Sequence, residues 1–251
     1  MNCLLGEIMQ IDQISDIEKV SLDPGAWIFF DIDYTLTKPG HRVLQNLQTL
    51  MGDCRTRKLY EQYSPEQKRL FPIVIVSHVP NVLVSPDIPG LLVRLQEKGH
   101  TILGCTAADT STFLSIGSVP EWREKELRRL GITFTQKGPP KSFKQFTPYR
   151  TTYPLFQKGV LYTNTDTVSK EDAMLALLDH LGERPPQIVL VDDSRKNFEG
   201  IEQKMEEERI PFLGFHFIPQ QEEETISDQE RNEVWDSIQK RIEKESLYEG
   251  R

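Results

Sequence analysis

The segment AWIFFDIDYT, residues 26–35, places an apolar run directly before the first of two aspartates. A short run that is apolar at every position is typical of a strand that is buried on both faces of a parallel sheet. The apolar run stops at Asp31, and Asp33 follows two residues later. We therefore predict a buried strand over residues 26–30 with both carboxylates at its carboxyl end.

Two later apolar runs end in the same way. TILGC, residues 101–105, is followed by Thr106, and QIVLV, residues 187–191, is followed by Asp192 and Asp193. The carboxyl ends of parallel strands meet at one edge of a sheet, and ligands bind at that edge in open α/β folds. We therefore expect these polar side chains to lie near Asp31.

Helix-like segments precede both of these runs. Residues 88–98 stop at Gly99 and residues 170–181 stop at Gly182. Glycine is a common helix terminator because it accepts the left-handed backbone conformation, and Ser169 is the expected N-cap of the second helix. The alternation of helix and strand predicts an α/β fold with a doubly wound, mostly parallel sheet.

The two carboxylates of DIDYT suit phosphoryl transfer. On a turn that leaves the strand, Asp31 and Asp33 flank one small site. One carboxylate attacks phosphorus and forms an acyl phosphate, while the other gives a proton to the departing oxygen and later takes one from the hydrolytic water. The residues alone do not say which of the two aspartates attacks.

A phosphate beside several aspartates requires compensating positive charge. Mg²⁺ binds carboxylates and phosphoryl oxygens together, and Asp192 and Asp193 supply carboxylates for it. Lys170, at the start of its helix, would neutralise the nucleophile and the phosphoryl group, and Lys158 competes for this role. Thr106 would donate its hydroxyl to a phosphoryl oxygen.

These elements, in this order, resemble the four motifs of the haloacid dehalogenase-like (HAD) hydrolase superfamily. The motifs are DIDYT, Thr106, Lys170 and VDDSRKN (residues 191–197), and the resemblance covers most of the chain, residues 27–217. It implies a HAD-like core with Asp31 as nucleophile, Asp33 as general acid and base, and Thr106 and Lys170 as phosphoryl-stabilising residues. It also implies a magnesium site formed by Asp31, Asp192, Asp193 and the backbone carbonyl of Asp33.

Residues 37–86 separate the first two motifs and are too many for a simple crossover. They contain a polar helical stretch near residues 43–63 and an apolar run at residues 73–76. We predict a small, mainly helical cap beside a core of residues 1–36 and 87–251. The segment resembles the HAD cap that screens the site and shapes substrate choice, and an elaborate crossover without a substrate role is the alternative.

Within the superfamily, an acidic residue at the position of Asp33 accompanies phosphatases and some phosphomutases. Residues 85–99 (SPDIPGLLVRLQEKG) and 212–217 (FLGFHF) resemble a little-characterised bacterial branch of it. The resemblance implies a Mg²⁺-dependent phosphomonoester hydrolase. A phosphomutase acting on a sugar phosphate and a catalytically silent HAD-like binding protein are the alternatives.

Three further segments complete the expected organisation. Residues 133–154 favour a long loop or irregular hairpin, and residues 212–217 a late edge strand. The tail from residue 220 is expected to continue into an amphipathic helix that docks through one apolar face. That face consists of Val234, Trp235, Ile238 and Ile242.

Single residues outside the motifs have simpler interpretations. His41 and His78 could reach the substrate or be solvated loop residues. We expect Asn197 to make local hydrogen bonds rather than to bind metal. Cys105 lies in an apolar run and is expected to be a buried small hydrophobe.

Composition narrows the classes of partner. Of 251 residues, 37% are hydrophobic and 27% are charged, which is typical of a globular protein. The net charge of -8 argues against nucleic acid and anionic membranes as partners, whereas a small phosphorylated substrate needs only local positive potential. Three cysteines without metal-like spacing, no signal-like start and no long apolar stretch predict a cytoplasmic protein. The sequence does not predict the oligomeric state.

Overall fold

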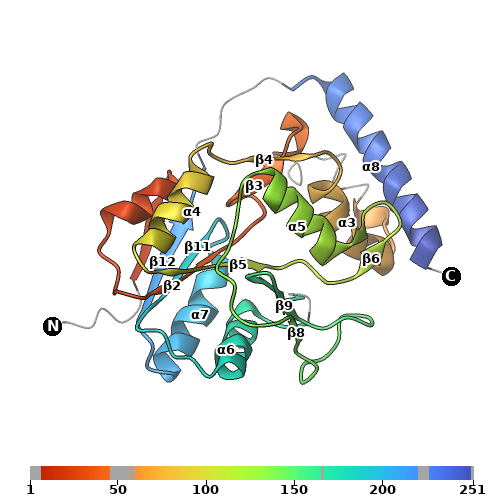
Figure 1. Cartoon of the computed structure of the whole chain (residues 1–251). Coiled ribbons are helices and arrows are strands. Elements are labelled where there is room, and N and C mark those ends of the chain that lie inside the picture. Colours follow the sequence, from red (N-terminus) through yellow and green to blue (C-terminus); the bar gives the residue numbers. More distant parts are fainter. Residues whose placement is uncertain (1–6, 46–56, 58–59, 165–166, 220–225, 250–251) are drawn as a thin grey trace.

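An eight-stranded sheet runs through the computed structural model, which describes residues 7–45, 57, 60–164, 167–219 and 226–249 (Figure 1). The six strands from one edge inward are parallel, and the last two pairings are antiparallel. The mostly parallel α/β sheet predicted from the sequence is therefore confirmed. In order across the sheet, the strands are β1 (Glu7–Ile11), β12 (Phe212–Phe217), β11 (Ile188–Asp192), β2 (Trp27–Phe30), β5 (Thr101–Thr106), β10 (Val160–Tyr162), β9 (Leu155–Gln157) and β8 (Lys141–Ser142).

Helices cover both faces of this sheet (Figure 1). On one face lie α4 (Ile88–Glu97) and the 3-10 helix η1 (Ile14–Lys19). On the other lie α6 (Lys170–Leu181) and α7 (Lys196–Glu207). The sheet is thus the middle layer of three, as expected of a doubly wound fold.

The central strand β2 is buried on both faces because its side chains alternate between two apolar cores. Ile28 and Phe30 pack in the core on the α4 side, and Trp27 and Phe29 pack in the core on the α6 side. All four are at most 3% exposed. A strand of this kind has no polar face, which is why its sequence is apolar at every position.

The helices α4 and α6, which precede β5 and β11, end at the glycines predicted to terminate them. Gly99 follows α4 with φ of 88°, and Gly182 caps α6 in the left-handed conformation with φ of 63°. The N-cap prediction at Ser169 is also confirmed, because its hydroxyl accepts a hydrogen bond from the Asp172 amide at 3.2 Å.

The order of the strands reverses at β2. The chain runs from β2 through α4 to β5 on one side, and β11 lies on the other side of β2 after α6. At such a switch point the connections on the two sides leave the carboxyl edge in opposite directions and open a crevice. The DIDYT turn lies at this point of the sheet.

One prediction about the sheet was wrong: β12 is not an edge strand. It lies between β11 and β1, with Phe215 paired to Val191 on one side and to Met9 on the other. The β1 segment EIMQI, which was not predicted, provides the outer partner because its mixed polarity suits a strand with one exposed side. The apolar β12 is accordingly an interior strand.

The described part of the insertion begins and ends on a small antiparallel ladder. β3 (Thr37–Pro39) pairs with β4 (Asn81–Leu83), and between them lie the 3-10 helix η2 (Arg42–Leu44) and α3 (Pro65–Val76). The apolar run at residues 73–76 is the last turn of α3. The predicted helical stretch at residues 43–63 falls largely outside the described residues, and the division into core and cap stays a prediction.

The last helix, α8 (Asp228–Glu249), packs on α3 (Figure 1). Trp235 stacks on Phe71 with ring centroids 5.8 Å apart and planes 6° apart. The predicted docking face is confirmed, since Val234, Trp235, Ile238 and Ile242 are each at most 8% exposed.

Between β5 and β8 the chain forms the short strands β6 (Thr112–Phe113) and β7 (Gly117–Ser118) and the helix α5 (Val119–Arg129). Residues 133–154 are irregular apart from β8 and a bridge between Tyr149 and Thr152, as predicted. Among the described helices, none has the length and apolar character needed to span a bilayer.

Candidate active site

The turn after β2 holds both aspartates of DIDYT in place through backbone hydrogen bonds. The Asp31 amide donates to the Val191 carbonyl at 2.9 Å, and the amides of Leu36 and Thr37 donate to the Ile32 carbonyl at 3.0 and 2.9 Å. Tyr34 adopts a left-handed conformation with φ of 67°, which is uncommon outside glycine. The backbone therefore turns sharply enough for Asp31 and Asp33 to diverge.

Three carboxylates converge at the carboxyl edge of β2 and β11. One oxygen each from Asp31, Asp192 and Asp193 lies within 4.8 Å of the others. Asp31 is 7% exposed and Asp192 is fully buried. Buried carboxylates this close repel one another unless a cation lies between them, and oxygen ligands are those that Mg²⁺ prefers. The donor set therefore fits a hard divalent cation.

Lys170 lies at the first position of α6 and reaches into this cluster. Its Nζ atom is 2.6 Å from Asp31 Oδ1 and 2.6 Å from Asp192 Oδ2, and its side chain is 3% exposed. The competing candidate, Lys158, is exposed in the β9–β10 turn, which lies at the amino end of β10 and so at the opposite edge of the sheet. The structure thus brings Lys170, and not Lys158, to the aspartates.

Thr106 ends β5 beside the DIDYT turn, because Phe30 of β2 is paired with Gly104 two residues earlier. The Thr106 hydroxyl is buried and accepts a hydrogen bond from the Ala108 amide at 3.2 Å. This contact orients the oxygen and leaves the hydroxyl proton to be donated elsewhere. The placement agrees with the expected role of Thr106 toward a phosphoryl oxygen, which stays a prediction.

The cluster carries more negative than positive charge. Burial raises the pKa of Asp31 well above its ordinary value, Lys170 opposes this shift, and Asp192 and Asp193 add to it. Burial, and then the neighbouring Asp192, raise the pKa of Asp193 to about 6. Burial disfavours the Lys170 ammonium, but the attraction of Asp31 and Asp192 outweighs it and the pKa of Lys170 rises. With three carboxylates against one ammonium, the site attracts protons or a cation.

Two further residues, Thr35 and Asn197, hold the aspartates by hydrogen bonds. The sequence analysis assigned no role to Thr35. The Thr35 hydroxyl accepts a hydrogen bond from the Asp193 amide at 3.1 Å and lies 3.4 Å from Asp193 Oδ1. Asn197 Nδ2 donates to both oxygens of Asp192 at 3.0 and 2.8 Å, which are the local hydrogen bonds expected of it. The motif letters DIDYT and VDDSRKN contain both residues, but only the fold shows which aspartate each one contacts.

Asp33 turns its carboxylate toward α5. Arg123 Nη2 lies 2.7 Å from each of its two oxygens. Arg123 was missed because the surrounding segment, PEWREKELRR, has the charge density of a solvated helix. The expected metal contact of Asp33 through its backbone carbonyl stays a prediction.

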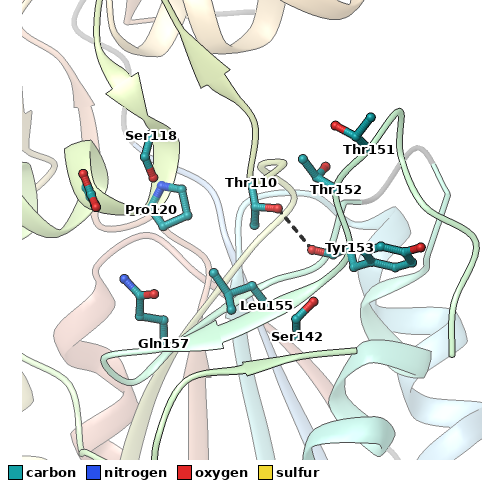
Figure 2. A pocket seen from close by; sticks show the side chains of 10 residues that line it. Thr110, Ser118, Pro120, Ser142, Thr151, Thr152, Tyr153, Leu155 and Gln157 are labelled. Carbon is teal, nitrogen blue, oxygen red and sulfur yellow. Dashed lines mark hydrogen bonds between the residues drawn. The ribbon is translucent and has the colours of Figure 1, made fainter. Parts of the chain in front are cut away.

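A pocket of about 330 Å³ lies beside the first turn of α5 (Figure 2). Leu155 and Gln157 of β9 form one wall, and the Thr110 hydroxyl donates to the Tyr153 carbonyl at 3.1 Å across another. Six of its ten lining residues carry a hydroxyl group. The lining residues are Thr110, Ser118, Pro120, Glu121, Ser142, Thr151, Thr152, Tyr153, Leu155 and Gln157.

The two histidines of the insertion, His41 and His78, interact with residues near them. His41 Nδ1 accepts a hydrogen bond from the Val43 amide at 3.3 Å and caps η2. His78 is partly buried, and burial followed by the charge of Arg241 lowers its pKa. Cys105 is fully buried as expected, and burial raises its pKa to about 12.

Comparison with protein families gives one match that spans nearly the entire chain. The family described as "Protein of unknown function (DUF2608)" matches residues 7–248. The chain belongs to this family. The matched range contains all strands of the large sheet and the three aspartates of the cluster.

A curated relative is similar to this DUF2608 chain at low identity. An uncharacterized protein of Rickettsia felis is 23% identical over 141 residues, which are 54% of this chain and 47% of that protein. The chain therefore spans about half the length of that relative.

Two solved structures are also similar in part. A haloacid dehalogenase-like family hydrolase from Streptococcus pneumoniae has 14% identity and a TM-score of 0.42, covering 75% of this chain and 93% of that one. The HAD domain of an effector protein from Legionella pneumophila, solved as an inactive mutant, has 11% identity and a TM-score of 0.39, covering 90% and 98%.

Proposed function

We propose that this chain is a Mg²⁺-dependent phosphomonoester hydrolase that works through an aspartyl phosphate on Asp31. The observation that carries the proposal is the meeting of Asp31, Asp192 and Asp193 around the Lys170 ammonium at the switch point of the sheet. A structural ion pair needs one carboxylate for each ammonium, whereas this cluster has three. The excess charge is what a site for a cation and a phosphoryl group requires.

Asp31 is the proposed nucleophile. It follows the central strand directly, and its Oδ1 is held by Lys170 at 2.6 Å, which leaves the other oxygen to attack phosphorus. Lys170 would offset the charge that builds up on the phosphoryl oxygens, and the Thr106 hydroxyl would donate to one of them. The substrate is then a small phosphorylated molecule that fits between these groups.

Asp33 is the proposed proton carrier. Its carboxylate contacts Arg123 of α5 and is 22% exposed, so it can reach a group that arrives from solvent. It would protonate the departing oxygen while the Asp31–phosphorus bond forms. It would then take a proton from the water that hydrolyses the aspartyl phosphate.

Asp31, Asp192, Asp193 and the Asp33 backbone carbonyl are the groups that would hold Mg²⁺, as the convergence of the three carboxylates supports. When bound, the ion would supply positive charge next to the nucleophile and the phosphoryl oxygens. Asn197 and Thr35 would keep the two aspartates of β11 and its loop oriented toward it.

The test is hydrolysis of p-nitrophenyl phosphate with MgCl₂ or with EDTA. We expect activity with Mg²⁺, none with EDTA, and a loss of about 10³-fold or more in Asp31→Asn, since an amide of nearly the same shape is a poor nucleophile. The matched control is Asp179→Asn, which alters an exposed aspartate on α6 that pairs with Arg184. Full turnover in Asp31→Asn would exclude the mechanism.

A further inference from the structure

Arg123 is the unusual charged residue of α5. Its neighbours along the helix, such as Arg128 and Arg129, are exposed or partly exposed, but Arg123 is fully buried. A guanidinium keeps its positive charge even when it is buried. It therefore requires a counter-charge inside the structure.

Asp33 provides that counter-charge. Arg123 Nη2 lies 2.7 Å from both Asp33 oxygens, and the guanidinium also stacks over Trp122 at 4.6 Å from the ring centroid. Within the described part of the chain, Arg123 Nε and Nη1 are buried without a hydrogen-bond partner. Because breaking a buried pair leaves an uncompensated charge, this contact is costly to release.

The orientation of the Asp33 carboxylate is set by its contact with Arg123. Asp33 is two residues from Asp31 and is partly exposed, and its carboxylate is not one of the three that converge on the cation site. Binding there would turn a proton carrier into another anionic ligand. Arg123 instead holds the carboxylate on the α5 side of the turn.

We infer that Arg123 is a positioning residue that holds Asp33 where it can protonate the leaving group. The inference rests on the proposed function. In the structure both Asp33 oxygens lie 2.7 Å from Arg123 Nη2. When Asp33 takes up a proton, one oxygen keeps this contact and the other carries the proton. As the Asp31–phosphorus bond forms and the substrate P–O bond breaks, that proton moves to the departing oxygen, and water later returns a proton to Asp33.

The ratio of activity on alkyl and aryl phosphates distinguishes a positioning role of Arg123 from a purely structural one. A nitrophenolate departs as a stable anion and needs little protonation, whereas an alkoxide departs only with a proton. If Arg123 acts through Asp33, its loss affects alkyl phosphates far more than aryl phosphates. If it only stabilises the fold, both substrates suffer equally.

The experiment compares Arg123→Lys and Arg123→Met with the unmutated chain on p-nitrophenyl phosphate and glycerol 2-phosphate. We expect kcat on glycerol 2-phosphate to fall by about 100-fold or more and kcat on the aryl phosphate by less than about 10-fold, in line with the usual contribution of general acid catalysis. Arg123→Lys keeps a charge at the site and serves where Arg123→Met does not fold. The control is Arg129→Lys, which alters an α5 arginine that pairs with Glu126.

A double variant separates positioning from direct action. In Asp33→Asn the proton carrier is already gone, so adding Arg123→Lys should change kcat on glycerol 2-phosphate less than twofold. Equal losses on both substrates, or a full additional loss in the double variant, would overturn the role of Arg123 while the hydrolase assignment stands. Absence of Mg²⁺-dependent hydrolysis in the unmutated chain would overturn both.

Discussion

Asp192 and Asp193 are neighbours in sequence but differ in how well their charges are compensated. Asp192 accepts hydrogen bonds from Lys170, Asn197 and the Ser194 amide. Among the residues that the structure describes, the Thr35 hydroxyl is the one side chain that donates a hydrogen bond to the Asp193 carboxylate, and burial raises the pKa of Asp193 to about 6. Asp193 is therefore the carboxylate that gains most from a cation.

This difference predicts that Asp193→Asn stabilises the metal-free protein. The folded-state pKa of about 6 lies above the ordinary value of 3.8, so the folded state binds the extra proton. Stability attributable to Asp193 is then intact below about pH 4 and is lost as pH rises through about 6. We expect Asp193→Asn to add about 1–3 kcal/mol at pH 7.5 in EDTA.

Urea unfolding at pH 7.5 and pH 5 checks this expectation. The advantage of Asp193→Asn should shrink at pH 5, and saturating Mg²⁺ should stabilise the unmutated chain more than the variant. A variant that is no more stable than the unmutated chain at pH 7.5 would contradict the charge excess argued for the cluster.

The strands and helices that carry the site could largely be predicted, because short stretches of sequence determine them. β2, β5 and β11 are apolar at nearly every position, and α4 and α6 end at glycines, so short windows of sequence contain the signal. The aspartates and Thr106 lie at the carboxyl ends of these strands, whereas the choice between Lys170 and Lys158 needed the fold. The convergence of these strand-end residues needed only the rule that parallel strands share a carboxyl edge.

What escaped prediction depends on partners distant in sequence. Whether β12 is an edge or an interior strand depends on β1, and EIMQI gives no strong strand signal by itself. The burial of Arg123 depends on Asp33, and a charged helix such as α5 does not reveal which arginine faces inward. Such pairings are tertiary choices rather than local preferences.

The N-cap of α6 predicts a link between helix geometry and catalysis. Ser169 caps the helix immediately before Lys170, so Ser169→Ala should cost about 1 kcal/mol of stability and also lower kcat several-fold by loosening the first turn. Ser64→Ala removes the corresponding hydroxyl from the capping box of α3 and should cost as much stability without lowering kcat. Urea unfolding and steady-state kinetics on both variants test this, and an equal effect on kcat would remove the link.

Beyond the central sheet, the chain is held together by the contact of α3 with α8. Trp235 is 1% exposed and stacks on Phe71, and Arg241 donates to the Ser77 carbonyl at 2.7 Å at the end of α3. Glu245 is buried and accepts hydrogen bonds from the amides of Leu114 and Ser115. The last helix thus joins the insertion to the segment that follows β5.

Removing the Trp235 ring should therefore destabilise the protein substantially. We expect Trp235→Ala to lower the free energy of unfolding by about 3–5 kcal/mol, because it leaves a large cavity between α3 and α8. Leu247→Ala on the same helix should cost less than about 0.5 kcal/mol, since Leu247 is 75% exposed. Similar unfolding midpoints for the two variants would show that α8 contributes little.

The pairing of β1 with β12 imposes an order on biosynthesis. A ribosome releases Glu7–Ile11 early and Phe212–Phe217 late, so the first strand waits for its partner through most of translation. Until then the flank of β11 that β12 will cover is open to other extended chains. A nascent chain that stalls before β12 emerges would display this unprotected flank, and chaperones that recognise extended apolar segments would find it there.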